Sequence, residues 1–322
     1  MNYRGIIKEK LHKIYVITAG ILIFSLICGC NVPATGATKK TGLRIVVSSY
    51  PIYEWVSMIT RGVDGTDLSY ILYKDIHDYE LTDTEKEDIK TCDLFIYVGG
   101  PSDKKLEEAL KSSKDQKVIN LMKACKEGAK LETDDETHID DEHIWMSLTI
   151  AQHCVSYLAD QISELDKDNE PAYLENATSY IEKLTDLREY FGKVMDEFEG
   201  NTLIFADKFP FTQMMNEYGC DYLLAGNICP KDDYNGYSII EIKQKLAKNS
   251  IKCILTASDP DSEVIAKIRK AAGEDIPVYR LYSIEKPEET AFTPSEEATY
   301  YSMMYDNMLV FEDMLTKKGL ID

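Results

Sequence analysis

The sequence predicts an α/β fold with two lobes, each built on a parallel sheet, joined by one long rigid helix. Three observations predict it. Short β-branched segments alternate with helical segments over residues 42–168. The same alternation returns over residues 200–322, and residues 169–199 between them form one amphipathic run. Strands separated by helical stretches are typical of βαβ units and therefore of parallel sheets.

The first lobe is expected over residues 42–168. Its predicted strands are short runs rich in Val, Ile, Leu and aromatic residues, at 43–48, 68–73, 94–98 and 117–121. Its predicted helices have polar or amphipathic spacing, at 52–59, 83–92, 104–112 and 144–158. Gly99 and Gly100 end the third strand, because paired glycines favour a turn.

The linking helix is expected over residues 169–199. Its apolar residues recur at three- and four-residue spacing: Leu174, Ile181, Leu184, Leu187, Phe191, Val194 and Phe198. No proline interrupts the run after Pro171. The pattern predicts a single helix of about eight turns, long enough to connect two lobes stiffly.

The second lobe is expected over residues 200–322. Its predicted strands repeat the β-branched pattern of the first lobe, at 202–206, 221–224, 252–257 and 278–281. Its predicted helices are amphipathic and of moderate length, at 208–217, 238–248, 262–272 and 300–315. The last helix alternates Met and aromatic residues, which we expect to fill the core.

The first 29 residues have the pattern of a secretory signal. Basic residues precede an apolar run at 14–27, and Cys28-Gly29-Cys30 follows. The run is shorter than the roughly 20 residues of a membrane-spanning helix. Its end resembles a bacterial lipobox, which implies that Cys30 is lipidated; an ordinary cleaved signal is the alternative. Residues 30–41 are small and polar and read as a lipidated tether.

Composition and charge limit the function classes. The net charge of −20 argues against nucleic-acid binding, which needs a basic face. Six cysteines follow Cys30, none of them in a CxxC pair, and the sequence leaves their pairing open.

Two histidines occupy positions suited to binding a cation. His77 follows the second predicted strand and precedes a helix, and His143 follows an acidic loop and precedes the next helix. Ligands collect at the carboxyl ends of strands in α/β sheets. The loop at 132–142 holds seven acids and His138. It either gathers cations weakly or is a solvated loop.

Four segments together resemble a known family. They are "VVSSYPIYEWV", "IHDYELT", "CDLFIYVGG" and "DEHIWMSL", and "YYSMMYDNM" near the end extends the likeness over nearly the whole mature chain. The chain resembles the cluster A-I solute-binding lipoproteins of zinc and manganese ABC transporters. The resemblance implies two α/β lobes joined by one long helix.

The resemblance also implies a ligand set. His77 matches the first family ligand, His143 the second and Asp207 the third, although Asp207 could instead cap the helix after it. Tyr282 stands where the family usually places an acid, and core packing is its alternative role. Glu285, three residues on, could reach the metal in its place. Two imidazoles with oxygen donors suit Zn²⁺ or Mn²⁺.

The implied function is an extracytoplasmic, lipid-anchored receptor that captures a divalent transition metal between its lobes, zinc ahead of manganese. It would deliver the ion to an ABC permease and its ATPase, and we expect a monomer. The alternatives are a metal-dependent hydrolase and a surface adhesin of the same fold. No HExxH or GxSxG motif supports an enzyme.

Overall fold

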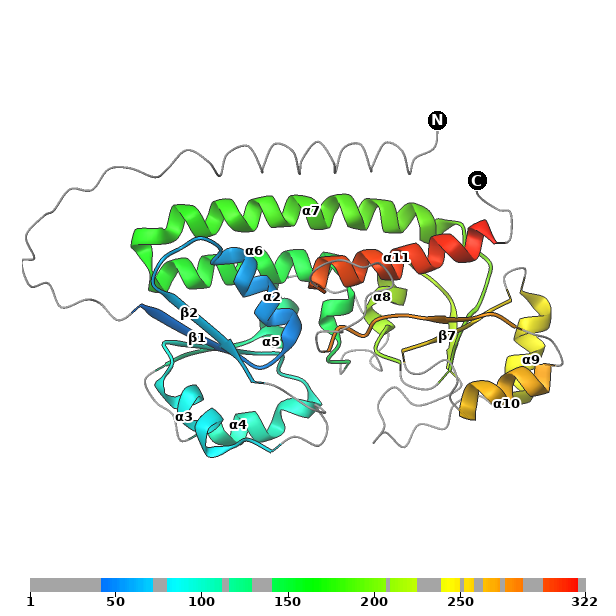
Figure 1. Cartoon of the computed structure of the whole chain (residues 1–322), viewed down its shortest axis with the longest axis horizontal. Helices are drawn as coiled ribbons and strands as arrows, with labels where there is room; N and C mark the ends of the chain where they lie inside the picture. Colours follow the sequence, from blue (N-terminus) through cyan, green and yellow to red (C-terminus); the bar gives the residue numbers. More distant parts are fainter. Residues whose placement is uncertain are drawn as a thin grey trace, which may run out of the picture. The chain divides into compact units, whose positions relative to one another are not determined.

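Two four-stranded parallel sheets organise the chain (Figure 1). The structure is a computed structural model. It describes ten segments: residues 42–71, 80–111, 116–128, 141–206, 209–224, 239–249, 252–257, 263–272, 276–285 and 298–317. The predicted signal peptide, the tether and Cys30 lie outside these segments.

The first sheet has the strand order β2-β1-β3-β4. Its strands are β1 (Leu43–Val47), β2 (Thr66–Tyr70), β3 (Leu94–Tyr97) and β4 (Lys117–Asn120). All pairs are parallel, so every carboxyl end meets the same edge. From β1 the chain continues to β2 on one side of the sheet, and from β3 it continues to β4 on the other side. The carboxyl ends of β1 and β3 therefore form the switch point of the topology, where α/β sheets usually bind ligands.

Helices connect these strands as the sequence predicts, with one addition. They are α2 (Tyr50–Ile59), α3 (Asp83–Thr91), the 3-10 turn η1 (Pro101–Asp103), α4 (Lys104–Leu110) and α5 (Leu121–Gly128). A capping box between Thr82 and Glu85 starts α3. The helix α5 was not predicted, because its two turns follow β4 without any break in the sequence.

Two long antiparallel helices follow. The predicted helix at 144–158 divides into a 3-10 turn, η3 (Ile144–Met146), and α6 (Leu148–Leu165). The Ser147 hydroxyl accepts a hydrogen bond from Ile150 N and caps α6. The turn η4 (Lys167–Asn169) leads into α7 (Glu170–Asp196), a helix of 27 residues that confirms the predicted linking helix.

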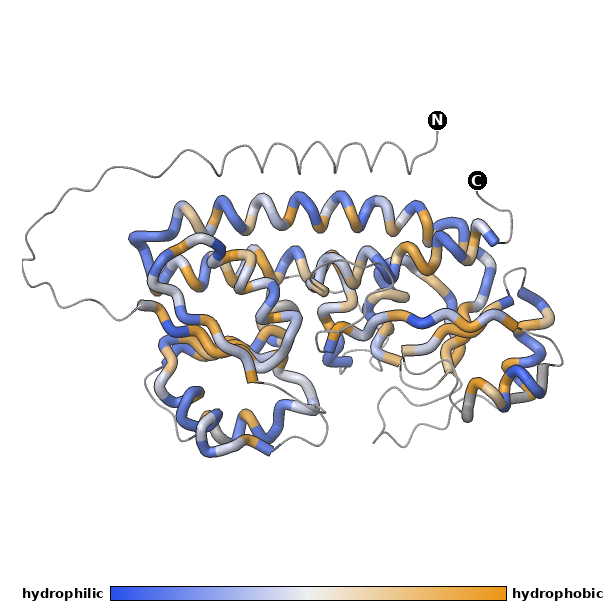
Figure 2. The backbone as a smooth tube through the Cα atoms, viewed as in Figure 1, coloured by the Kyte–Doolittle hydropathy of each residue, from blue (hydrophilic) through white to orange (hydrophobic). Residues whose placement is uncertain are grey.

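The buried stripe of α7 differs from the predicted one near its start. Leu174 is 38% exposed, whereas Tyr173 is fully buried. The Tyr173 hydroxyl lies 2.9 Å from Asp166 Oδ2, so an aromatic ring with a polar tip occupies the inward position. The helix packs on α6, α2 and α11, and Figure 2 shows hydrophilic and hydrophobic residues alternating along it.

The second sheet repeats the topology of the first, with the order β6-β5-β7-β8. Its strands are β5 (Leu203–Ala206), β6 (Tyr222–Leu224), β7 (Ile254–Thr256) and β8 (Val278–Arg280). Its helices are α8 (Thr212–Glu217), α9 (Ile239–Lys248), α10 (Glu263–Ala272) and α11 (Tyr300–Thr316). The two-lobed α/β fold is therefore confirmed.

One hydrophobic cluster runs through both lobes. It joins Ile45 and Leu94 of the first sheet to Phe205 and Leu255 of the second, through α6, α7 and α11. The opposite faces of the two sheets have smaller cores of their own. Alternate residues of β1 and β5 face these different cores, as the two-residue period of a strand requires. The exact lobe boundaries at 168/169 and 199/200 remain predictions.

Candidate metal centre

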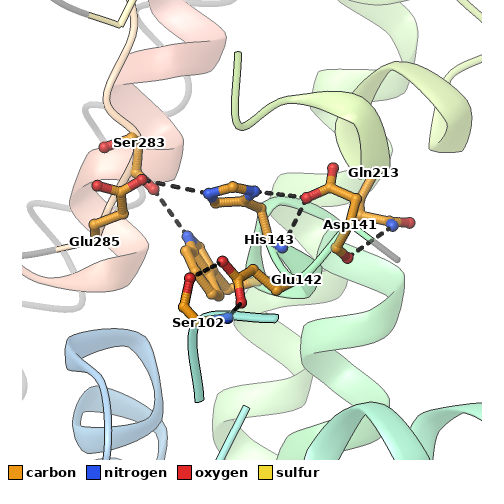
Figure 3. Close-up of polar contacts among 8 residues, drawn as sticks. Ser102, Asp141, Glu142, His143, Gln213, Ser283 and Glu285 are labelled. Carbon is orange, nitrogen blue, oxygen red and sulfur yellow. Dashed lines mark hydrogen bonds and ion pairs between the residues drawn. The ribbon is translucent and has the colours of Figure 1, made fainter. Parts of the chain in front are cut away.

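His143 lies at the start of η3 and is completely buried. Its Nδ1 is 2.6 Å from Asp141 Oδ1, and the same oxygen accepts a hydrogen bond from the His143 backbone N–H at 3.0 Å. The Trp145 ring packs edge-on at 5.1 Å between centroids. These contacts fix the orientation of the imidazole and direct Nε2 away from Asp141 (Figure 3).

Glu285 faces His143 from the other lobe. Its Oε1 lies 3.4 Å from Nε2, on the side opposite Asp141 (Figure 3). This contact is an ion pair that falls short of hydrogen-bond geometry, and no described residue accepts a hydrogen bond from Nε2. A buried polar nitrogen and a carboxylate oxygen thus face each other without a well-formed bond.

The loop that carries Glu285 follows β8, and hydrogen bonds from side chains to its backbone hold it in place. Asn307 on α11 accepts from Tyr282 N at 2.7 Å and donates to Tyr282 O at 3.0 Å. Trp145 Nε1 donates to Ser283 O at 2.8 Å. Ile284 then adopts φ = +58°, a strained conformation for a β-branched residue. Strain of this kind persists only where surrounding contacts impose it.

The charges of the site are strongly coupled. Burial alone would lower the pKa of His143, but the Asp141 and Glu285 carboxylates outweigh it and raise the pKa to about 10. Burial likewise opposes ionisation of Asp141, and the adjacent imidazolium overcomes it and lowers the pKa of that carboxyl. Without a metal, His143 therefore carries a proton at neutral pH.

The donor set suits a borderline divalent cation. A histidine whose Nδ1 is held by a carboxylate is the usual arrangement of a metal-bound imidazole, with the metal on Nε2. A carboxylate oxygen beside that nitrogen adds a second donor type that zinc and manganese accept. Among the described residues, no three His, Cys, Asp or Glu side chains converge as a complete ligand shell.

The other predicted ligands have different outcomes. His77, Asp207 and the acidic loop up to residue 140, with His138, lie outside the described residues. Tyr282 is 2% exposed and belongs to the main core, with the Arg280 guanidinium 5.8 Å from its ring centroid. Its position favours the packing role that the sequence left open.

Sequence reasoning missed the residues that hold the ligands in place. Asp141 appeared only as one acid of the loop and the first residue of the DEHIWMSL segment, and Asn307 only as a polar residue in a Met-rich helix. The two-residue spacing of Asp141 and His143 is a signal that could have identified the pair. Nothing local to Asn307 indicates its contact with Tyr282, which is 25 positions away.

A small cavity adjoins the site at the carboxyl ends of β1 and β3. Ser48, Ser49, Ser102, Glu142 and Trp145 line most of it, and its volume is about 20 Å³. The hydroxyls of Ser48 and Ser49 are buried and make no hydrogen bond to a described residue. A cavity of this size beside two such hydroxyls has room for a single water molecule.

The cysteines of the described residues are not part of this site. Cys92, Cys154 and Cys253 are buried, and Cys220 is half-buried. Burial raises the pKa of both Cys92 and Cys220 to about 11, so these thiols stay protonated at neutral pH.

Fold and site together define a two-lobed solute-binding protein with a candidate metal centre between its lobes. The model of the periplasmic zinc-uptake complex component A family matches residues 45–314, and the chain belongs to that family. Its members are transport components, which agrees with the prediction that the chain is not an enzyme.

Individual relatives agree with this assignment. The chain is 24% identical over 323 residues to the high-affinity zinc uptake system protein ZnuA of Bacillus subtilis, covering 97% of this chain and 99% of that protein. It is 22% identical to the zinc-binding lipoprotein AdcA of Streptococcus pneumoniae but spans only 61% of that longer protein.

Solved structures confirm the fold. The periplasmic zinc-binding protein TroA of Treponema pallidum superposes with a TM-score of 0.70 at 18% sequence identity. The match covers 85% of this chain and 99% of TroA.

Proposed function

We propose that the chain captures a divalent transition metal between its lobes, zinc ahead of manganese, with His143 Nε2 and the Glu285 carboxylate as ligands. The 3.4 Å between Nε2 and Oε1 carries the proposal. Two ligands held at about 2.0–2.2 Å by one tetrahedral zinc ion are themselves about 3.4 Å apart. The pair is thus spaced as two ligands of the same ion, one from each lobe.

His77 and Asp207 complete the proposed ligand shell. Both come from the family resemblance, and their types fit a site with two imidazoles and two carboxylates. With Glu285 supplying the second carboxylate, Tyr282 is left to packing, as its burial suggests.

Zinc is the favoured ion because the family description and the names of the relatives refer to zinc uptake or zinc binding. Manganese is the competitor, because the same mixed nitrogen and oxygen donors accept it. Zinc stands later in the affinity order for divalent metals, so a site of this composition binds zinc more tightly.

Delivery to an ABC permease and its ATPase is the proposed use of the captured ion. The protein acts outside the cytoplasm as a monomer, anchored through lipidated Cys30. The family description supports a role outside the cytoplasm, and the lipobox-like ending supports the anchor. Among the residues that the structure describes, no helix has the length and apolarity to cross a membrane.

Competition titration with a zinc-chelating dye tests the metal site. We expect His143→Ala and Glu285→Ala to weaken zinc binding by about a hundredfold and about tenfold, by analogy with the loss seen on removing groups around a metal. The control is His153→Ala, which removes a partly buried histidine of α6 in the same lobe. Wild-type affinity in both ligand variants would overturn the proposal.

Radiolabelled fatty-acid incorporation tests the anchor. Expression in a bacterial host with a lipoprotein pathway should label the wild-type chain, and Cys30→Ala should abolish the label. Equal labelling of Cys30→Ala would show that another residue carries the lipid.

A further inference from the structure

Glu142 directly precedes His143, yet its side chain points elsewhere. It is 5% exposed, and its carboxylate turns toward Ser102 rather than toward the imidazole (Figure 3). Glu142 Oε2 accepts from Ser102 N at 2.9 Å, and Oε1 accepts a short hydrogen bond from the Ser102 hydroxyl. One serine therefore binds both oxygens of a buried acid 40 positions away.

The backbone beside Ser102 is shaped to admit this side chain. A Cβ on Gly100 would lie 2.2 Å from Glu142 Cβ and 2.3 Å from Oε2. Contacts that short do not occur, so only glycine allows the loop to approach Glu142 so closely. Glycine at position 100 thus leaves room for the Glu142 side chain and also suits the turn after β3.

The loop that holds Glu142 is itself fixed to the first sheet. Asp103 is 6% exposed and accepts from Gly99 N at 2.7 Å, which closes the turn that follows β3. The turn continues into α4. Glu142 is therefore attached to a part of the N-terminal lobe that is rigidly connected to β3.

Asp141 and His143 behave as one unit because the carboxylate of Asp141 bonds both the backbone N–H and Nδ1 of His143. On the other side, Gln213 of α8 reaches Asp141 O only at 3.5 Å. The two hydrogen bonds between Glu142 and Ser102 are shorter than this contact of Gln213, and Glu142 lies between Asp141 and His143 in the chain. Its contact with Ser102 thus sets where the pair sits relative to the first sheet.

We propose that Glu142, held by Ser102, is a positioning residue for the metal ligand His143. The inference rests on the proposed function, because it requires Nε2 to bind the metal. A ligand held in place before the metal arrives binds more tightly and releases it more slowly than one that must be ordered. Loss of a supporting hydrogen bond around a metal ligand costs about 10–100-fold in affinity.

Stopped-flow release of Zn²⁺ to a chelating dye tests the proposal. We expect Ser102→Ala and Glu142→Ala each to speed release by about tenfold. The double variant should be no faster than either single variant, because both remove the same contact. Gly100→Ala, which displaces Glu142 without removing it, should have the same effect.

The control is Asn249→Ala, which removes two hydrogen bonds between Asn249 and Thr202 at the start of β5. We expect it to lower the melting temperature and leave zinc release unchanged. If Ser102→Ala and Gly100→Ala fold and behave like this control, Glu142 has only a structural role and the proposal is overturned.

His143→Ala in the same series separates the two proposals. If His143→Ala loses zinc while the Ser102 and Gly100 variants release zinc at the wild-type rate, the positioning proposal is wrong and the proposed metal site stands. If His143→Ala binds zinc as the wild type does, the proposed metal site is wrong, and the positioning role falls with it. Should Glu142→Ala fail to fold, Ser102→Ala and Gly100→Ala still decide the outcome.

Discussion

The two sides of the candidate metal centre are held in place by different chemistry. On the N-terminal side, the contacts are made by buried carboxylates: Asp141 contacts the imidazole of His143, and Glu142 accepts a hydrogen bond from Ser102. On the C-terminal side, neutral groups hold the backbone next to Glu285, namely the Asn307 amide and the Trp145 indole.

This difference indicates how each side responds to perturbation. A carboxylate contact depends on charge, so the N-terminal side is sensitive to pH and to isosteric amide substitutions. An amide that satisfies two buried backbone groups does not titrate, and its loss leaves both groups unpaired. The N-terminal side should therefore control metal affinity, and the C-terminal side should control stability.

The largest effect is expected on the C-terminal side. Asn307 is fully buried, and Asn307→Ala leaves Tyr282 N and O without their partner. We expect a loss of about 3 kcal/mol in the free energy of unfolding, measured by urea denaturation. Asn176→Ala is the control, because Asn176 also bonds two backbone groups, the carbonyls of Ile59 and Arg61, but is only partly buried. Equal losses would contradict the special role of Asn307.

On the N-terminal side, Asp141→Asn should change affinity more than stability. The amide keeps the shape of the side chain but removes the charge that favours the imidazole orientation. We expect zinc affinity to fall about 10–100-fold in a competition titration. Unchanged affinity in a folded variant would show that Asp141 does not support the ligand.

The pH dependence of zinc binding sharpens the comparison further. The pKa of His143 is raised to about 10, so zinc must displace a proton throughout the neutral range. We expect the affinity to rise about tenfold per pH unit from pH 7 toward pH 9 and to level off near pH 10. Calorimetry in buffers of different ionisation enthalpy should find about one proton released per ion. No proton release at pH 7 would contradict a protonated His143.

The same pKa shift predicts the opposite trend for the metal-free protein. Because the folded pKa of His143 is raised, its protonated form stabilises the fold fully below the unfolded value of about 6.5. That contribution is lost as the pH rises through about 10. Urea denaturation with a chelator present should show stability falling over this window, and His143→Gln should remove that part of the fall.

The smallest effect concerns the helix starts, where the lobes should not differ. Thr82 caps α3 in the first lobe and Thr299 caps α11 in the second, each in a reciprocal capping box. We expect Thr82→Ala and Thr299→Ala each to cost about 1 kcal/mol in unfolding free energy. A much larger cost for either cap would mean that the lobes differ by more than the contacts at the metal centre.

Local sequence was sufficient for most of the fold. The apolar runs predicted the eight strands of the described residues, and β3 and β5 are the continuous buried segments that this pattern implies. The strand β2 (Thr66–Tyr70) is half-exposed and begins two residues before the predicted strand at 68–73. The apolar spacing of α7 predicted a single long helix, since Pro171 lies in its first turn and no other proline follows within it. The helix α5 was missed because two turns carry too little periodic signal to separate them from β4.

The candidate site was predicted in part. His143 stood out as a histidine between an acidic loop and an apolar helix, and Glu285 as an acid near a position where the family places one. The contacts of Glu142 with Ser102 and of Asn307 with Tyr282 were beyond sequence reasoning. They join residues 40 and 25 positions apart whose local patterns are those of ordinary loop and helix residues.

The sequence by itself determined the order of strands and helices, the long connecting helix and the histidine of the first lobe, because these follow from periodicity and residue chemistry over short distances. Only the tertiary structure decided that Asp141 orients His143, that Ser102 holds Glu142, and that Glu285 reaches Nε2 at 3.4 Å. Those contacts form when two sheets and their loops pack around a shared core. No local pattern encodes which polar groups the packing then leaves facing each other.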